Sequence, residues 1–294
     1  MTKPTQLTLS APAKLNLFLH INSQRPDGYH ELQTLFQLVD IADILHFEIA
    51  DEISLTVSDT NNYNIQNEDN LIVQAAKALN TYTNNHFGTH ITLEKNLPIG
   101  GGVGGGSSDA ATTLLGLNSL WNLGLSIDEL ANIGKKLGAD VPVFVRGHTS
   151  FAEGIGEKLS QVNLDQRFFL IVKPDAHVST MKIFTSKELT RDTTYLRIRH
   201  PFETACLQEF HNDCEPLVRK LYPEVDEVFN LLEKFGSPRL TGTGACVFIT
   251  FEHESDAKQA FAQLPKSLQA WVAKGVNMSN THIELKKWNN TNNA

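Results

Sequence analysis

The residues best suited to chemistry form one glycine-rich stretch, which runs from Pro98 to Asp109. Six of its first nine residues are glycine, and such a backbone can turn tightly and approach a ligand closely. Residues 90–94 alternate as in a strand, and residues 110–117 are typical of a helix that a residue between Ser107 and Asp109 could cap. The free N–H groups and the positive dipole at a helix start attract anions. The stretch therefore predicts a binding site for phosphate groups.

The residues around the glycines narrow the type of phosphate loop. No Gly-Lys-Ser/Thr sequence closes the stretch, so it is not a Walker loop. Gly100, Gly102 and Gly105 match the dinucleotide pattern G-x-G-x-x-G, but a glycine run does so easily, and that fold needs a second strand after the helix. The next element is instead a helix that opens with a capping box at Ser126. His-Arg-Asp and Asp-Phe-Gly are absent, which excludes a protein kinase, and a flexible linker would not lie between a strand and an apolar helix.

Two charged residues elsewhere could take part in proton transfer, although neither is decisive alone. Lys14 precedes residues 15–21, in which apolar and polar side chains alternate as in a half-buried strand. A single lysine in such a place is usually a solvated surface charge. Asp140 lies between a helix that ends at Gly138 and an apolar run, residues 141–145, which we expect to form a strand. From its position alone, a cap or turn is the commoner role for this acid.

Composition bounds the class of protein. The chain has 294 residues, 41% hydrophobic and 20% charged, as in an ordinary globular protein of two modest domains or one large one. A net charge of −8 argues against nucleic acid or an anionic membrane as the main partner. The three cysteines suggest neither a disulfide framework nor a zinc site, and no targeting segment or membrane span is visible. We therefore expect a cytoplasmic protein.

The order of the predicted strands and helices along the chain indicates two domains. A boundary within residues 162–167 gives an N-terminal ATP-binding domain of residues 1–163 and a C-terminal domain of residues 164–294. Helices are expected after a cap at Asp69 or Asn70, over 126–137, twice within 203–235 and over 255–264. Strands are expected at 7–10, 15–21, 35–38, 44–49, 53–57, 168–172, 270–276 and 283–288, with a break at 11–13 and a disordered tail at 289–294.

Three blocks, in order, resemble the three motifs of the GHMP kinases, small-molecule kinases that include galactokinase, homoserine kinase and mevalonate kinase. They are Pro12–Asn16, Pro98–Ser108 and Thr241–Ala245. Arg25–His30 and Gly138–Phe144 are most similar to a member of the family whose substrate carries a cytidine diphosphate. The resemblance implies a two-domain α+β fold. Its N-terminal domain would be ribosomal-protein-S5-like and its C-terminal domain ferredoxin-like, with the active site in the cleft between them.

The resemblance also implies roles for single residues on the ATP side. Lys14 and Asp140 would be the catalytic pair, since a carboxylate can accept the proton of an alcohol and a neighbouring lysine keeps it ionised. Asn70 and Lys95 would lie near the adenine and ribose. Mg²⁺ is expected with ATP; its protein ligands are left open, with Ser108 as the best candidate. The ATP phosphates would be wrapped by Pro98, Ile99, Gly100, Gly101, Gly102, Val103, Gly104, Gly105, Gly106, Ser107 and Ser108.

On the substrate side, the resemblance implies that Tyr29 and Phe184 stack on the cytosine and that His30 hydrogen-bonds its edge. Asn16 would lie at the hydroxyl that is phosphorylated. Thr180 and Gly242 would line the same pocket. Without the resemblance, the pair Tyr29-His30 after a Pro-Asp-Gly turn would be read as half-buried packing.

We therefore expect an ATP-dependent kinase that phosphorylates an alcohol group on a small molecule bearing cytidine diphosphate. It would act as a monomer or weak homodimer, with neither nucleic acid nor membrane as a partner. One alternative is a GHMP kinase for homoserine, mevalonate or a sugar, which the base-stacking pair Tyr29-His30 disfavours. Another is a nucleotide-binding module without catalysis, which the presence of both Lys14 and Asp140 disfavours. A dinucleotide oxidoreductase is disfavoured by the order of the elements.

Overall fold

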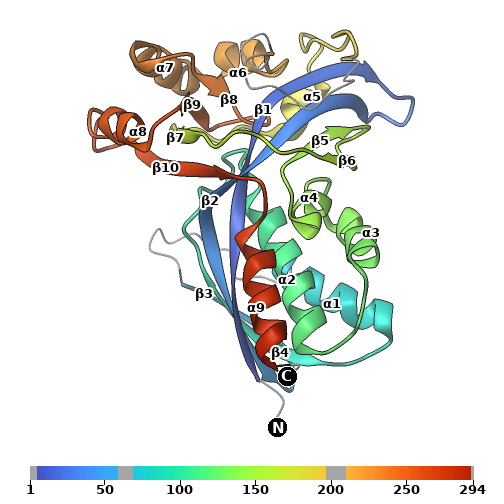
Figure 1. Cartoon of the computed structure of the whole chain (residues 1–294). Helices are drawn as coiled ribbons and strands as arrows, with labels where there is room; N and C mark the ends of the chain where they lie inside the picture. The colour runs from blue at the N-terminus through green and yellow to red at the C-terminus, as the bar shows by residue number, and fades with distance from the viewer. Residues whose placement is uncertain (1–4, 59–68, 197–209, 293–294) are drawn as a thin grey trace.

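A long antiparallel hairpin runs through the whole molecule (Figure 1). The computed structural model describes residues 5–58, 69–196 and 210–292. Its first two strands, β1 (Gln6–Gln24) and β2 (His30–Ala50), have 19 and 21 residues and are paired along almost their full length. One end of the hairpin lies among the N-terminal elements and the other end among the C-terminal elements. The hairpin therefore positions residues of the chain start against both halves.

The remaining strands extend this hairpin into one mixed sheet. Neighbouring strands follow the order β3-β4-β2-β10-β7-β9-β8, while β1 pairs with β2, and β5 pairs with β2 and β6. Among the strand pairs of the described residues, only β3 and β4 run parallel. Their bounds are β3 (Ile53–Ser58), β4 (Gly88–Glu94), β5 (Ser150–Glu153), β6 (Lys158–Gln161), β7 (Phe168–Lys173), β8 (Arg239–Leu240), β9 (Val247–Phe251) and β10 (Gln269–Val276).

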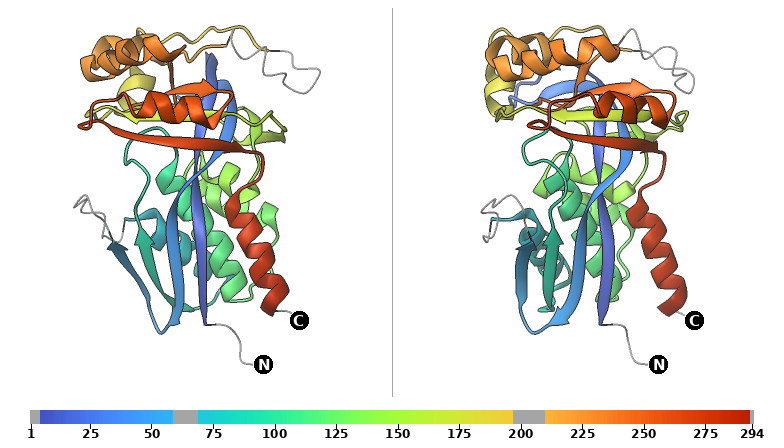
Figure 2. Two further views of the ribbon diagram at one scale, coloured as in Figure 1. Left: turned by 60° about the vertical axis from the view of Figure 1, so that its left-hand side comes forward. Right: turned by 90° about the vertical axis from the view of Figure 1, so that its left-hand side faces the viewer.

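Helices cover the sheet at both ends and enclose the hydrophobic cores. In the N-terminal half, α1 (Leu71–Thr83), α2 (Gly105–Leu120), α3 (Ile127–Leu137) and α4 (Val141–Arg146) lie together on one face of the strands (Figure 2). In the C-terminal half, α5 (Thr180–Thr185), α6 (Glu215–Leu221), α7 (Pro223–Leu232) and α8 (Glu254–Phe261) gather around β7 to β10. A third cluster of buried side chains, including Leu15, Val103 and Phe248, joins the two halves.

The last helix, α9 (Asn280–Asn292), leaves the C-terminal half and returns along β1 to the N-terminal half (Figures 1 and 2). Its Glu284 carboxylate accepts hydrogen bonds from the backbone N–H and the hydroxyl of Ser10, both at 2.7 Å, and Leu285 is buried in the N-terminal core. The predicted boundary between residues 163 and 164 remains a prediction. What the structure adds is that the chain crosses between the halves again after β10.

Local sequence signals placed several helix ends correctly. Asn70 caps α1, because its side-chain oxygen accepts a hydrogen bond from the N–H of Ile72 at 2.9 Å. Ser126 and Glu129 form the predicted capping box of α3, and Gly138 follows its last residue. The cap predicted between Ser107 and Asp109 is wrong: α2 begins at Gly105 after Gly104, whose φ of 77° puts the turn in the left-handed region.

Four predicted features are wrong for physical reasons. The strand does not break at residues 11–13, because β1 absorbs Pro12 in a register shift between Pro12 and Lys14. Residues 141–145 form helix α4 rather than a strand, since so short an apolar run carries no period and Pro142 suits a first helical turn. Residues 283–288 belong to α9, which also orders residues 289–292 of the predicted disordered tail. Residues 293–294 lie outside the described residues.

Candidate active site

A cavity of about 890 Å³ is bordered by the glycine loop, the middle of the hairpin, α5 and a second glycine turn at Thr241–Ala245. Every residue predicted for the site lines this cavity except Ser108. The lining therefore brings together segments that are more than two hundred residues apart in sequence, from Lys14 to Gly242. Their individual roles remain proposals, which the geometry below supports to different degrees.

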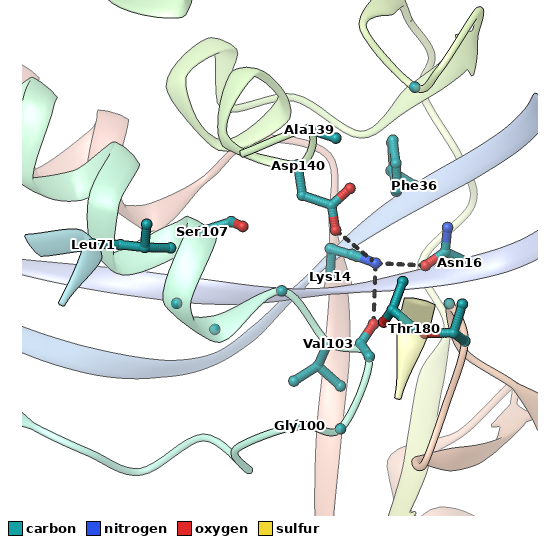
Figure 3. Close-up of a pocket in the computed structure, with 18 of the residues that line it drawn as sticks. Lys14, Asn16, Phe36, Leu71, Gly100, Val103, Ser107, Ala139, Asp140 and Thr180 are labelled. Carbon is teal, nitrogen blue, oxygen red and sulfur yellow. Dashed lines mark hydrogen bonds and ion pairs between the residues drawn. The ribbon is translucent and has the colours of Figure 1, made fainter. Parts of the chain in front are cut away.

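Lys14 and Asp140 meet in this cavity (Figure 3). The Lys14 ammonium lies 3.3 Å from the Asp140 carboxylate, and it donates hydrogen bonds to Asn16 Oδ1 at 2.6 Å and to the carbonyl oxygen of Gly102 at 3.0 Å. The Lys14 side chain is only 3% exposed, whereas that of Asp140 is 34% exposed. The lysine is therefore a fixed charge with three oxygen partners, while the carboxylate keeps an open side toward the cavity.

The position of Asp140 follows from the short helix that it precedes. Asp140 occupies the N-cap position of α4 but makes no side-chain cap hydrogen bond, so the carboxylate is directed to Lys14 instead of to the helix. Lys14 is held by its backbone, whose N–H donates to the carbonyl oxygen of Val103 at 2.9 Å. The hairpin, the glycine loop and α4 together thus fix the pair.

The glycine loop is packed tightly against the second glycine turn. Gly102 has a φ of 75°, and a Cβ atom there would lie 2.3 Å from the carbonyl oxygen of Thr241. The N–H groups of Ala245 and Cys246 donate to the carbonyl oxygens of Gly100 and Gly101 at 3.3 and 3.0 Å. The first turn of α2 starts at the end of this loop, so its free N–H groups and positive dipole face the cavity that the loop lines.

Asn16, Thr180 and Gly242 line the cavity as predicted, and the first two are already engaged. The Asn16 amide accepts from Lys14 through Oδ1 and donates to Thr34 Oγ1 at 2.9 Å. The Thr180 and Thr243 hydroxyls are 2.8 Å apart. Asn16 is therefore placed to orient Lys14 as well as to approach a substrate hydroxyl.

Lys95 lines the cavity as predicted, but its ammonium is already paired with two carboxylates. Its ammonium forms ion pairs with the carboxylates of Asp43 and Asp109, the latter at 2.9 Å, and all three side chains are buried. Asp43 also accepts hydrogen bonds from the N–H groups of Asn96 and Leu97 at 2.6 and 2.8 Å. Burial raises the pKa of Asp109 to about 7, although Lys95 opposes this and Asp43 adds to it.

The sequence did not predict that the carboxylates of Asp43 and Asp109 would pair with Lys95 beside the glycine loop. Asp43 is an acid inside the long, mostly buried strand β2, and Asp109 is an acid in the first turns of a helix that is buried along most of its length. A buried acid without a nearby cation in sequence was the available signal, because such a group must find a partner across the fold.

The residues predicted to hold a base line the same cavity. The rings of His30 and Phe184 are 5.1 Å apart at an angle of 33°, and Tyr29 is 60% exposed at the rim. Arg191, which the sequence reading did not single out, donates a hydrogen bond to His30 Nε2 at 3.0 Å. Burial and then Arg191 lower the pKa of His30, so the ring is held neutral.

The candidate magnesium ligand Ser108 lies just behind the cavity wall. Its hydroxyl is buried and has no hydrogen-bond partner among the described residues. No group of three or more His, Cys, Asp or Glu side chains in the described part of the chain could hold a metal ion.

Within residues 5–58, 69–196 and 210–292, no helix has both the length and the apolar character needed to span a membrane.

Comparison with known proteins agrees with this arrangement. Residues 70–148 match the GHMP kinases N terminal domain, and residues 202–270 match the GHMP kinases C terminal domain. The chain therefore belongs to the GHMP kinases. It is also similar to proteins named 4-diphosphocytidyl-2-C-methyl-D-erythritol kinase. That of Tolumonas auensis is 49% identical, with 98% of this chain and 99% of the relative covered.

Two further comparisons give the same result. The relative of that name in Marinobacter nauticus is 51% identical, with 96% of this chain and 98% of the relative covered. A crystal structure of 4-(cytidine 5'-diphospho)-2C-methyl-D-erythritol kinase is 30% identical and has a TM-score of 0.77, with 92% of this chain and 99% of that chain covered. The predicted family and its two-domain α+β fold are confirmed, and ATP is the co-substrate that the kinase family implies.

Proposed function

We propose that the protein transfers the γ-phosphoryl group of ATP to the 2-hydroxyl of 4-diphosphocytidyl-2-C-methyl-D-erythritol, giving the 2-phosphate and ADP. The reaction belongs to the non-mevalonate route to isoprenoid precursors. One observation carries the proposal: a single cavity is lined by the glycine loop, by the His30–Phe184 ring pair and by the Lys14–Asp140 pair. A cytoplasmic location remains a prediction.

Asp140 is placed to act as the general base. The acceptor is a tertiary alcohol, which is a poor nucleophile until its proton is removed. As its oxygen bonds to the γ-phosphorus, the proton passes to the Asp140 carboxylate, the bond from phosphorus to the bridging oxygen breaks, and ADP leaves. Lys14 favours the ionised carboxylate and carries a positive charge beside the transferring group.

The glycine loop supplies the charge stabilisation. Phosphoryl transfer depends on positioning and on neutralising charge rather than on covalent chemistry. The helix N-terminus that follows Gly104 offers N–H donors and a positive dipole to the ATP phosphates. The contacts between the glycine loop and residues 241–246 hold the loop in place before ATP binds, so little ordering of the loop is needed on binding.

Mg²⁺ is expected to accompany ATP. This cation usually keeps several waters and is held by substrate phosphates together with one or two protein oxygens. The buried hydroxyl of Ser108, which has no partner among the described residues, fits such an oxygen at the start of α2. Bound with ATP, Mg²⁺ would neutralise part of the phosphate charge.

A coupled assay of ADP release tests the proposal. The purified protein is given ATP with one alcohol at a time: the cytidyl substrate, mevalonate, homoserine and galactose. We expect turnover with the cytidyl substrate and none above the ATP-only background with the other three. Asp140→Asn, assayed beside it, controls for a contaminating kinase. Turnover of another alcohol at a higher kcat/KM, or none with the cytidyl substrate, would overturn the proposal.

A further inference from the structure

Arg191 joins the two rings of the predicted base site. It lies in the segment that follows α5, and its guanidinium donates through Nε to His30 Nε2 at 3.0 Å. The same side chain donates to the carbonyl oxygens of Phe184 at 2.8 Å, Ser186 at 2.6 Å and Leu189 at 3.0 Å. One residue thus holds the histidine ring and also the backbone that carries the phenylalanine ring.

This arrangement determines where the His30 proton lies. A guanidinium can only donate hydrogen bonds, so His30 Nε2 must be the acceptor, and a neutral ring then carries its proton on Nδ1. This is the reverse of the tautomer that a free histidine side chain prefers. Nδ1 itself makes no hydrogen bond to any described residue, and His30 lines the cavity. The ring is therefore a preset donor that lacks an acceptor within the described parts of the chain.

We infer that Arg191 is a positioning residue that holds His30 as the neutral Nδ1–H tautomer, and that this donor makes the site select cytosine over uracil. The inference deepens the proposed function and rests on it. On the edge that pairs with guanine, cytosine presents two adjacent acceptors, N3 and O2, whereas uracil carries a proton on N3. A donor fixed by Arg191 gains an acceptor from cytosine but meets a second donor in uracil, which leaves buried polar groups unpaired.

The tautomer can be measured directly in the intact protein. We would label histidine with ¹⁵N, record two-bond ¹H–¹⁵N spectra, and assign His30 as the ring signal lost in His30→Gln. We expect the Nδ1–H pattern for His30 in the wild type. In Arg191→Gln, whose amide can accept as well as donate, we expect a shift toward Nε2–H. Arg191→Lys, which can only donate, should keep the wild-type pattern. A wild-type ring protonated on Nε2 would overturn the inference without any variant.

Binding of CMP and UMP, measured by calorimetry, tests the selectivity. We expect the wild type to bind CMP at least about tenfold more tightly than UMP, and this ratio to fall below about threefold in Arg191→Gln. Arg191→Lys should restore part of the ratio, and ATP affinity should be unchanged in both variants. If Arg191 only stiffened the backbone, CMP and UMP would weaken equally and the ratio would survive, which would contradict the inference.

The kinase assay keeps this inference separate from the proposed function. If wild-type protein fails to phosphorylate the cytidyl substrate, the function is wrong, while the NMR pattern still decides the tautomer. If the wild type is active, Arg191→Gln should raise KM for the cytidyl substrate and leave kcat within about twofold, because Arg191 is not among the residues that line the cavity. A variant with an unchanged KM would contradict the role of Arg191.

Discussion

Two buried lysines lie near the glycine loop, and they differ in how exposed the carboxylates of their aspartate partners are. The Lys14 side chain meets Asp140, whose carboxylate is 34% exposed toward the cavity. Lys95 meets Asp43 and Asp109, whose side chains are 0% and 5% exposed. The more exposed Asp140 carboxylate has room for a substrate proton, whereas the nearly buried carboxylates of Asp43 and Asp109 are held by Lys95. The proposed function thus gives the Lys14–Asp140 pair a catalytic role and gives Lys95 with its two aspartates an architectural one.

Lys95, Asp43 and Asp109, called the sealed set below, connect the two segments that flank the glycine loop. Through Asp43, Lys95 is linked to the N–H groups of residues 96 and 97, which lead into the glycine loop. Through Asp109, it is linked to α2, which leads out of the loop. One ammonium thus clamps both flanks of the loop. The predictions below separate this clamp from the open pair, starting with the largest effect.

Removing the base from the open pair should have the largest effect. In Asp140→Asn, the side chain keeps its shape but cannot accept a proton, so kcat should fall by roughly 10²–10⁴. Substrate affinity and the free energy of unfolding should change little. Lys14→Met should cost a comparable factor, and the double variant less than the product of the two, because the pair acts as a unit. Steady-state kinetics would contradict this if Asp140→Asn kept near-wild-type turnover.

Breaking the sealed set should instead cost stability. Lys95→Met leaves two buried carboxylates without their cation, and we expect the free energy of unfolding to fall by about 3–5 kcal/mol in urea denaturation. The exposed Lys136 supplies the matched control, since Lys136→Met should stay within about 0.5 kcal/mol of wild type. Lys14→Met should lose less than Lys95→Met, because Asp140 can be solvated. Equal losses at Lys14 and Lys95 would erase the distinction between the two sets.

The loop between the two lysines should be sensitive at Gly104. Its φ is 77°, and an added Cβ atom would lie 2.8 Å from the Phe144 ring. We expect Gly104→Ala to weaken ATP binding by at least about tenfold, because the loop must move away from Phe144 and no longer places its N–H groups at the phosphates. Gly124→Ala is the control: its φ is 71° and nothing lies within 4 Å of the added carbon. It should share the strain but leave ATP affinity intact. Calorimetry that finds equal ATP affinity for both variants would count against the loop assignment.

The most gradual effect is a pH dependence of stability that comes from Asp109, spread over several pH units. Because the pKa of Asp109 is raised to about 7, the folded protein keeps a proton that the unfolded chain releases near pH 4. Asp109 therefore makes stability fall as pH rises between about 4 and 7, by at most about 1.4 kcal/mol per pH unit. Asp109→Asn removes this, so the unfolding free energy of the variant minus that of wild type should rise across the window. Parallel curves for the two proteins would contradict the assignment.

The sequence indicated the glycine loop from its residues alone, and the family resemblance was needed to add the other parts of the site that are continuous in the chain. The glycine loop, the Lys14 block and the second glycine turn are local patterns, and their residues do line one cavity. Asp43 and Arg191 could not be found in this way, because their partners Lys95 and His30 are 52 and 161 residues distant. Such pairings follow only from the path of the hairpin.

The errors in secondary structure have a similar origin. Residues 141–145 are too short an apolar run to show a period, and tertiary burial decides their state. In α9, Ile283 and Leu285 alternate with polar residues as in a strand, but only Thr281 and Leu285 of this helix are buried. A helix attached by so narrow a stripe gives little periodic signal, so its contact with β1 could not be anticipated.

The return of α9 to β1 also bears on how the chain is made. A ribosome delivers the N-terminal elements first, and domains usually fold in that order. Here the N-terminal core lacks Leu285, and Ser10 lacks Glu284, until after β10 has been synthesised. The nascent N-terminal half must therefore wait with one flank of β1 uncovered. Completion of its fold is coupled to synthesis of the C-terminal half, so an interrupted translation product would expose apolar surface that favours aggregation.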